Sequence, residues 1–148
     1  MELLVVFGLL VAVCGFCVFV DGQSREFFSF AADRDLVLSA LRRARAMAVN
    51  SICFGAGCVS GQSHGVHFDP AKKEAIIFQG DDFSARDCDF DEIIEFENQA
   101  VCIVAPFPVD IIFFLPAGDA GSSNVALKDD RGHYADISVN ESGRIDWQ

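Results

Sequence analysis

The chain of 148 residues has no lysine or arginine ahead of its long apolar run, and its first basic residue is Arg25. Secretory signal peptides carry basic residues before the apolar core, so this absence argues against that class of segment. It also leaves the positive-inside rule without a basic cluster that would orient a membrane span. An acid, Glu2, stands directly before eighteen uncharged residues, 3–20. As a helix this run is ~27 Å long, close to the ~30 Å hydrocarbon core of a bilayer, and we expect it to cross the membrane.

Basic residues are scarce in the whole chain, with 11 Lys and Arg against 22 Asp and Glu and a net charge of −11. Leaving out Glu2, the part beyond the apolar run has a net charge of about −10. Such a surface repels nucleic acids and anionic lipid headgroups, both of which need basic contacts. We therefore expect no nucleic-acid partner and no DNA-binding residues. A divalent cation or a basic partner would fit this charge better.

Motifs of catalysis are also missing. The sequence has no G-x-S-x-G, no Walker-type phosphate loop and no H-E-x-x-H, and no nucleophile stands near a recognisable base. Cys53, Cys58, His64 and His67 resemble a zinc set, but only five residues separate Cys58 from His64, which is much shorter than zinc-finger spacing. The sequence therefore predicts a protein that is not an enzyme and that has no zinc site.

Proline is absent from the first third of the chain, and glycine is absent from its second part. No proline occurs before Pro70, and residues 23–50 contain no glycine. Apolar residues recur there at helical spacing and predict a buried stripe formed by Val37, Leu41, Ala44 and Ala48. We expect one long helix over residues 2–50, with a membrane half over 1–22 and a soluble half over 23–50. Arg42, Arg43 and Arg45 would flank the stripe and pair with acids of the following domain.

Residues 51–148 have the character of an antiparallel β domain. A Gly/Ser-rich loop over 51–65 and an acidic loop over 80–92 separate runs rich in β-branched and aromatic residues. The fold class that we predict is α+β, with the long helix packed on about seven strands whose sheet covers the apolar stripe. The strand-like runs are 65–69, 74–79, 95–105, 109–115, 124–128, 135–139 and 145–147.

The six cysteines fall into two groups. Cys14 and Cys17 lie three apart on one face of the apolar helix, where we expect free thiols. In an exported domain the other four could form disulfides, but Cys102 lies in the apolar stretch AVCIVA and is expected to be a buried thiol. Two pairings stay open: Cys58 with Cys88, or Cys53 with Cys58.

The acidic loop contains the candidate ligand site. Asp87, Asp89 and Asp91 alternate as in loops that bind calcium through positions 1, 3 and 5, and Glu92 follows directly. Glu92 stands where an EF-hand has its glycine, and Asn98 where it has its bidentate glutamate. The loop is thus either a calcium site of another kind, with no other cofactor expected, or a solvated loop whose carboxylates repel one another.

Four groups of residues together resemble the type IV pilin-like proteins, most closely the minor pseudopilins of the H type and their FimT-like relatives. They occur in the family's order and extend over nearly the whole chain. The groups are E-L-L-V-V at 2–6, L-R-R-A-R-A at 41–46, F-L-P-A-G at 114–118, and I-S-V at 137–139 followed by G-R-I at 143–145.

The resemblance implies a structural protein that is built into a filament or initiates one. The family's glutamate at the position of Glu2 pairs with the free N-terminal amine of a neighbouring subunit. The partners implied are other pilins or pseudopilins, a prepilin peptidase and an inner-membrane assembly platform. The family's N-terminal processing and methylation would apply, and the β domain would lie outside the inner membrane on a single-pass anchor. Since the family's basic leader is absent before Glu2, we expect translation to start upstream. A different class of function is a membrane-anchored β domain that binds a ligand or calcium and never polymerises.

Overall fold

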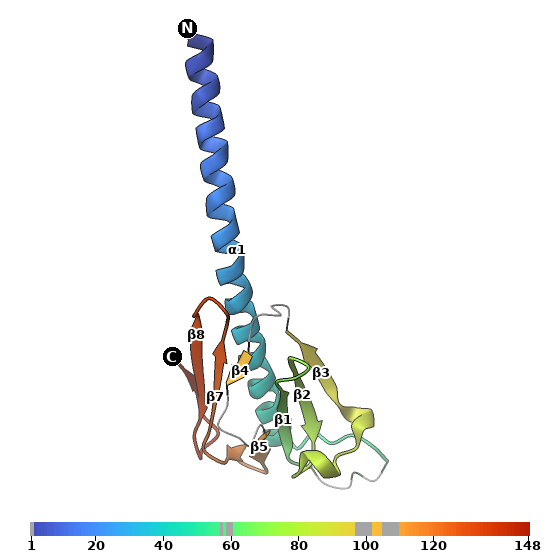
Figure 1. Cartoon of the computed structure of the whole chain (residues 1–148). Coiled ribbons are helices and arrows are strands. Elements are labelled where there is room, and N and C mark those ends of the chain that lie inside the picture. Colours follow the sequence, from blue (N-terminus) through green and yellow to red (C-terminus); the bar gives the residue numbers. More distant parts are fainter. Residues whose placement is uncertain (1, 57, 59–60, 97–101, 105–109) are drawn as a thin grey trace.

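The computed structural model describes residues 2–56, 58, 61–96, 102–104 and 110–148, and it describes the side chains of these residues except at 2–4, 16–27 and 102–104. It begins with one helix, α1 (Glu2–Val49), of 48 residues. The β domain, residues 51–148, surrounds the C-terminal half of α1, and the N-terminal half projects away from it (Figure 1).

α1 ends one residue before the predicted boundary, and local chemistry explains why. Asn50 donates from its side-chain amide to the carbonyl of Ala46 at 2.6 Å. Ser51 then takes a left-handed backbone with φ of 51°, and Ile52 N donates to Met47 O at 3.0 Å. A left-handed residue after the last turn satisfies carbonyls that a helix end leaves unpaired.

The first of two sheets has five strands in the order β3-β2-β1-β5-β6 among the described residues. The hairpin expected around 65–79 is confirmed, with Val66 opposite Ile77 in an antiparallel pair. All pairs in this sheet are antiparallel. The strands are β1 (His64–Asp69), β2 (Glu74–Gln79), β3 (Glu92–Glu95), β5 (Asp110–Phe114) and β6 (Asp119–Ala120).

The second sheet has four antiparallel strands in the order β4-β7-β8-β9, again counted over the described ranges. Its strands are β4 (Cys102–Val104), β7 (Ser123–Lys128), β8 (Tyr134–Val139) and β9 (Ile145–Trp147). The prediction of about seven strands was too low. One strand was expected over 95–105. In the structure β4 alone lies within that range, and β3 lies before it, at the end of the acidic loop, and belongs to the other sheet. β6 is only two residues long, too short for a pattern to reveal.

The core lies where the C-terminal half of α1 meets both sheets. The predicted helix stripe of Val37, Leu41, Ala44 and Ala48 is fully buried, each residue with 0% exposure. Val66 and Phe68 of β1 belong to the same apolar cluster. The second sheet contributes Val125, Leu127, Ala135, Ile137 and Val139. One helix face therefore joins the two sheets, which are also linked by a hydrogen bond from Ala120 N of β6 to Glu141 O in the turn between β8 and β9, at 3.1 Å.

A second junction fixes the terminal hairpin on α1. Arg45 donates from Nη2 to Ser142 O at 3.2 Å, so this arginine binds a carbonyl and not an acid as expected. A Cβ added to Gly118 would lie 2.6 Å from Val49 Cγ2 and 3.1 Å from Arg45 Cγ. One added to Gly143 would clash with the Gly118 carbonyl oxygen. Gly118 and Gly143 also have left-handed φ angles of 72° and 70°. The three residues belong to three separate motifs of the sequence, and the fold brings them into contact.

We predict that Gly143→Ala lowers the free energy of unfolding by about 1–3 kcal/mol, because the left-handed φ and the clash act together. Gly132 has a φ of 93°, and an added Cβ there would meet no other atom. Gly132→Ala should therefore lower the free energy of unfolding only by the cost of backbone strain. Gly121→Ala, with open space, is the matched control and should stay within about 0.5 kcal/mol of the parent. Thermal denaturation of the three variants checks this ranking, and equal losses in all three would contradict it.

Candidate functional site

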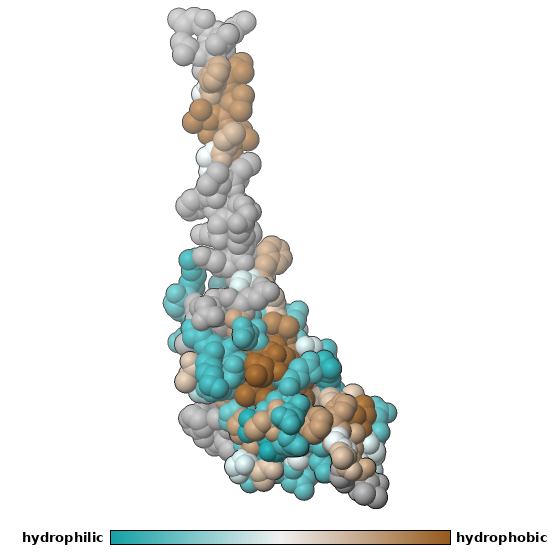
Figure 2. Space-filling model, turned by 90° about the vertical axis from the view of Figure 1, so that its right-hand side faces the viewer, coloured by the Kyte–Doolittle hydropathy of each residue, from teal (hydrophilic) through white to brown (hydrophobic). Residues whose placement is uncertain are grey.

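The projecting half of α1 exposes a continuous apolar surface. Seven large apolar residues between Val5 and Val13 are each 55–69% exposed, and Figure 2 shows this part as a mostly brown rod. A shallow strip on it is lined by Phe7, Leu10, Val11, Cys14 and Gly15. Such a patch marks a membrane or protein contact, because soluble proteins rarely expose contiguous apolar surface of this kind. Within the described part of the chain, no helical segment combines the length and the apolar character needed to cross a bilayer.

Three residues of the sequence prediction fall in regions whose side chains the structure does not describe. Glu2 lies at the first residue of α1, Cys17 within α1 and Cys102 at the start of β4. The predicted charge pair of Glu2 and the thiols of Cys17 and Cys102 stay predictions. Cys14 is a free, exposed thiol on α1.

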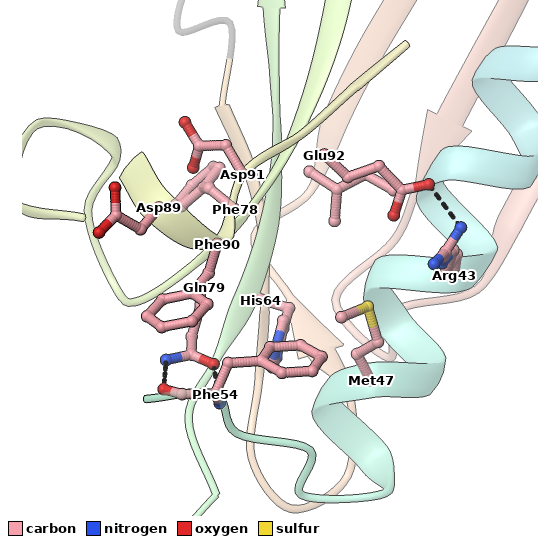
Figure 3. Close-up of a pocket in the computed structure, with 11 residues that line it drawn as sticks. Arg43, Met47, Phe54, His64, Phe78, Gln79, Asp89, Phe90, Asp91 and Glu92 are labelled. Carbon is pink, nitrogen blue, oxygen red and sulfur yellow. Dashed lines mark hydrogen bonds and ion pairs between the residues drawn. The ribbon is translucent and has the colours of Figure 1, made fainter. Parts of the chain in front are cut away.

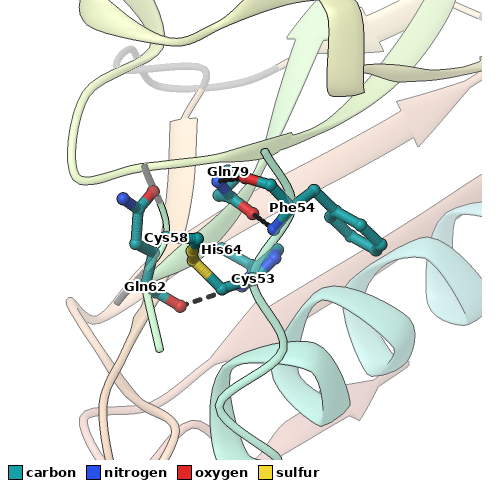
Figure 4. The surroundings of a disulfide bond; sticks show 6 residues. All are labelled: Cys53, Phe54, Cys58, Gln62, His64 and Gln79. Carbon is teal, nitrogen blue, oxygen red and sulfur yellow. Dashed lines mark hydrogen bonds between the residues drawn. A yellow bond between two sulfur atoms is a disulfide. The ribbon is translucent and has the colours of Figure 1, made fainter. Parts of the chain in front are cut away.

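A disulfide closes the loop after α1. Cys53 and Cys58 are bonded, with their Cα atoms 5.9 Å apart (Figure 4). Cys88 is a free, exposed thiol. Of the two pairings left open by the sequence, Cys58 with Cys88 is therefore not the one in the structure. The bonded loop also contacts β2, since Phe54 N donates to Gln79 Oε1 at 2.7 Å and Gln79 Nε2 donates to Phe54 O at 3.1 Å. The side-chain amide of Gln79 thus holds the disulfide loop against β2 with two hydrogen bonds.

The disulfide loop, the acidic loop and α1 enclose a pocket, which we call the His64 pocket (Figure 3). Its volume is about 220 Å³. Among its lining residues are Arg43 and Met47 of α1, Phe54, His64 and two residues of the acidic loop, Phe90 and Glu92. The rings of Phe54 and Phe90 stack with centroids 6.1 Å apart and planes 17° apart.

His64 is the buried polar group of this pocket, with 1% exposure. Its Nδ1 lies 3.0 Å from the carbonyl oxygen of Gln62, which can only accept, so Nδ1 carries the proton in the neutral ring. Nε2 is then an acceptor, and it has no partner among the described residues. Burial lowers the pKa of His64 below its usual value, and the hydrogen bond to Gln62 offsets this only in part. The ring is therefore neutral at physiological pH.

The acidic loop exposes the side chains of Asp81, Asp82, Asp87 and Asp89, whereas Asp91 and Glu92 are half-buried. Arg86 lies at its centre and donates from Nε to Asp91 Oδ2 at 2.8 Å and from Nη1 to Phe83 O at 2.8 Å. Glu92 accepts from Arg43 Nη1 of α1 at 2.5 Å, which confirms for Arg43 the expected pairing with an acid. The predicted loop instead contains two short 3₁₀ turns, η1 (Phe83–Ala85) and η2 (Cys88–Phe90).

Three of the four carboxylates proposed for calcium make other contacts. Asp87 accepts from the backbone N of Asp89 at 3.2 Å, and Asp91 and Glu92 hold arginines. In the residues that the structure describes, no three His, Cys, Asp or Glu side chains are arranged to hold a metal ion. The geometry gives the calcium prediction no support.

The residues of the rejected zinc set do not converge. Strand residues alternate between faces, so His64 and His67 of β1 point to opposite sides of the sheet. His67 stacks on Phe83 with centroids 3.6 Å apart, and its Nδ1 lies 2.5 Å from Asp110 Oδ1. Cys53 and Cys58 are used by the disulfide.

Sequence reasoning missed the His64 pocket because its walls come from segments far apart in the chain. Phe54 and Phe90 lie in loops without periodicity, and the Arg43–Glu92 pair joins residues 49 positions apart. One signal was present: a histidine at the first position of an apolar strand, in register with buried Val66 and Phe68.

We predict that stability falls as the pH drops below about 6.5, the pKa of histidine in an unfolded chain. The folded ring has the lower pKa, so the unfolded state binds more protons there and the free energy of unfolding rises with pH. One proton contributes at most about 1.4 kcal/mol per pH unit. Melting temperatures of the parent and of His64→Asn between pH 5.5 and 8 check this, with a shallower slope expected for the variant. Parallel slopes would contradict it.

Comparison with known proteins gives one structural relative to report. No protein-family model matches the chain, and no curated protein matches its sequence. Among solved structures, the chain is similar to the minor pseudopilin EpsH from the type 2 secretion system of Vibrio cholerae, with a TM-score of 0.53 and 11% identity. The match covers 80% of this chain and 94% of that one. At this identity the likeness shows the fold, which is pilin-like: an N-terminal helix packed on antiparallel sheets.

Proposed function

We propose that this chain is a minor pilin or pseudopilin subunit that is built into, or initiates, a type IV pilus-like filament or a type II secretion pseudopilus. The observation that carries the proposal is the division of α1. Its C-terminal half is the core of the β domain, and its N-terminal half exposes large apolar side chains that the chain itself does not cover. The pilin-like fold supports the same role.

We assign the chain a structural role, in which it acts by packing against other subunits and not by catalysis. The exposed helix would pack against the helices of neighbouring subunits, in the lipid before assembly and in the filament core afterwards. Because lipid tails are as apolar as the side chains at 5–13, close van der Waals packing between helices, and not removal from water, would stabilise that contact. The β domain would lie outside the inner membrane.

Glu2 is the residue that we assign to register between subunits. Apolar helices can slide along one another, and a buried carboxylate limits such sliding because it needs an oppositely charged partner. The free N-terminal amine of the neighbouring subunit would supply that charge. Other pilins or pseudopilins, a prepilin peptidase and an inner-membrane assembly platform are the partners that this role requires.

A tethered β domain that binds a ligand without polymerising is the second candidate, and the His64 pocket is the observation that favours it. The two candidates differ in what surrounds the exposed helix. In a filament the strip at Phe7, Leu10 and Cys14 faces another subunit, whereas a tethered domain leaves it in lipid.

We predict that a photoreactive maleimide on Cys14 forms adducts with pilin-like chains in cells that assemble the filament. Cys17→Ser and Cys88→Ser would be introduced first, so that Cys14 is the labelled thiol of α1. Glu2→Ala should leave the chain in the membrane fraction but abolish these adducts, because the register pair is lost. Gel shifts identified by mass spectrometry provide the readout.

Glu2→Asp, which keeps the anion, is the matched control and should retain most of the adducts. Adducts that persist unchanged in Glu2→Ala would remove Glu2 from the assembly site. Labelled chains that crosslink to lipid alone in the parent would favour the tethered domain.

A further inference from the structure

The His64 pocket contains an acceptor for which the fold provides no donor. His64 Nε2 is buried and has no partner in the described part of the chain. The carbonyl of Gln62 fixes the tautomer, so this nitrogen offers a lone pair and not a proton. Native proteins satisfy nearly all buried polar groups, and one that is left open at a pocket indicates a ligand that donates.

The size of the pocket limits that ligand. Its volume of about 220 Å³ is below the roughly 300–1,000 Å³ of sites that hold drug-sized molecules, so a single side chain fits better. Part of its wall is apolar and aromatic. In Figure 3 the ring of Phe54 lies between Phe90, on which it stacks, and Met47 of α1, and His64 lies behind it. A flat or elongated group with an apolar stem would contact these walls.

The charge of the pocket selects a cation. Asp89, Asp91 and Glu92 line it together with Arg43, and Arg86 lies beside it on Asp91, so the acids exceed the arginines by one negative charge. Glu92 is paired with Arg43, and Asp91 with Arg86. Asp91 nevertheless keeps one buried oxygen, Oδ1, without a partner among the described residues. In Figure 3 Asp89 and Asp91 lie on the acidic-loop side of the pocket, and their carboxylates point away from His64 toward its outer edge.

We propose that the His64 pocket receives an arginine side chain of a partner protein. The guanidinium is planar, stacks on aromatic rings and carries five donors, which matches a pocket with phenylalanine walls and an open acceptor. His64 Nε2 accepts a hydrogen bond from it, and the carboxylates of the acidic loop balance its charge. The site goes beyond filament assembly through α1, because it lies on the β domain and needs only a protein that presents an arginine.

The test uses the full chain in detergent micelles at pH 7.5 with N-acetyl-arginine amide as the probe. We expect a saturable shift of the His64 ring nitrogen resonances, with a dissociation constant on the order of 1 mM. N-acetyl-norleucine amide has a side chain of similar length but lacks the donors and the charge, and it should give no saturable shift. The resonances of His67, on the opposite face of β1, should stay unchanged with both probes.

Two matched variants test the role of charge. Asp89→Asn removes an exposed carboxylate at the pocket and should weaken binding about two- to fivefold. Asp81→Asn removes an exposed carboxylate of the same loop outside the pocket and should leave the affinity unchanged. His64→Phe removes the acceptor and should abolish saturable binding, which can be followed in the resonances of Phe54.

Three results would overturn the proposal: no saturable response to the arginine probe, equal responses to the arginine and norleucine probes, or equal affinities in Asp89→Asn and Asp81→Asn. None of them would bear on assembly through Glu2, which the Cys14 adducts test separately.

Discussion

The apolar stripe on the second half of α1 is the contact that both sheets share. Val37, Leu41, Ala44 and Ala48 are fully buried, and α1 contacts β1, β2 and β5 of one sheet and β9 of the other. The small side chains of Ala44 and Ala48 allow the strands to approach the helix closely. Leu41 packs in the same core cluster as residues of both sheets. Neither sheet has a second helix to cover its inner face among the described residues. The β domain therefore depends on this one helix face for its core.

The two halves of α1 make different contacts: the C-terminal half packs in the β domain, and the N-terminal half is exposed. Because the stripe stops short of the N-terminal half, residues such as Phe7 and Leu10 contribute nothing to the β domain and stay free for other chains or lipid. The His64 pocket lies at the opposite end of the helix, where Arg43 and Met47 meet the disulfide and acidic loops. The two surfaces are separate, so contacts along the helix and contacts to the β domain can be made by different partners.

The sequence predicted the parts of the fold that rest on periodicity. The stripe and the hairpin at Val66 and Ile77 follow directly from spacing. The lack of proline before Pro70 and of glycine over residues 23–50 predicted the helix. It could not predict the acidic loop, where Arg86 holds Asp91 and Phe83, because such contacts leave no pattern. For the same reason the sequence could not decide between the two possible cysteine pairings, and it did not predict the pocket around His64. Glu2, the main predicted site, lies outside the described side chains.

Hydrogen exchange on a pair of matched leucine variants tests most directly whether one helix face holds both sheets. Leu41→Ala removes a fully buried side chain and should cost about 2–5 kcal/mol, so the amides of β1 and of β8 should lose protection together. Leu10→Ala makes the same change on the exposed half of α1 and should leave both sheets as protected as in the parent. If Leu41→Ala exposes one sheet while the other keeps its full protection, the two sheets do not share a core on α1.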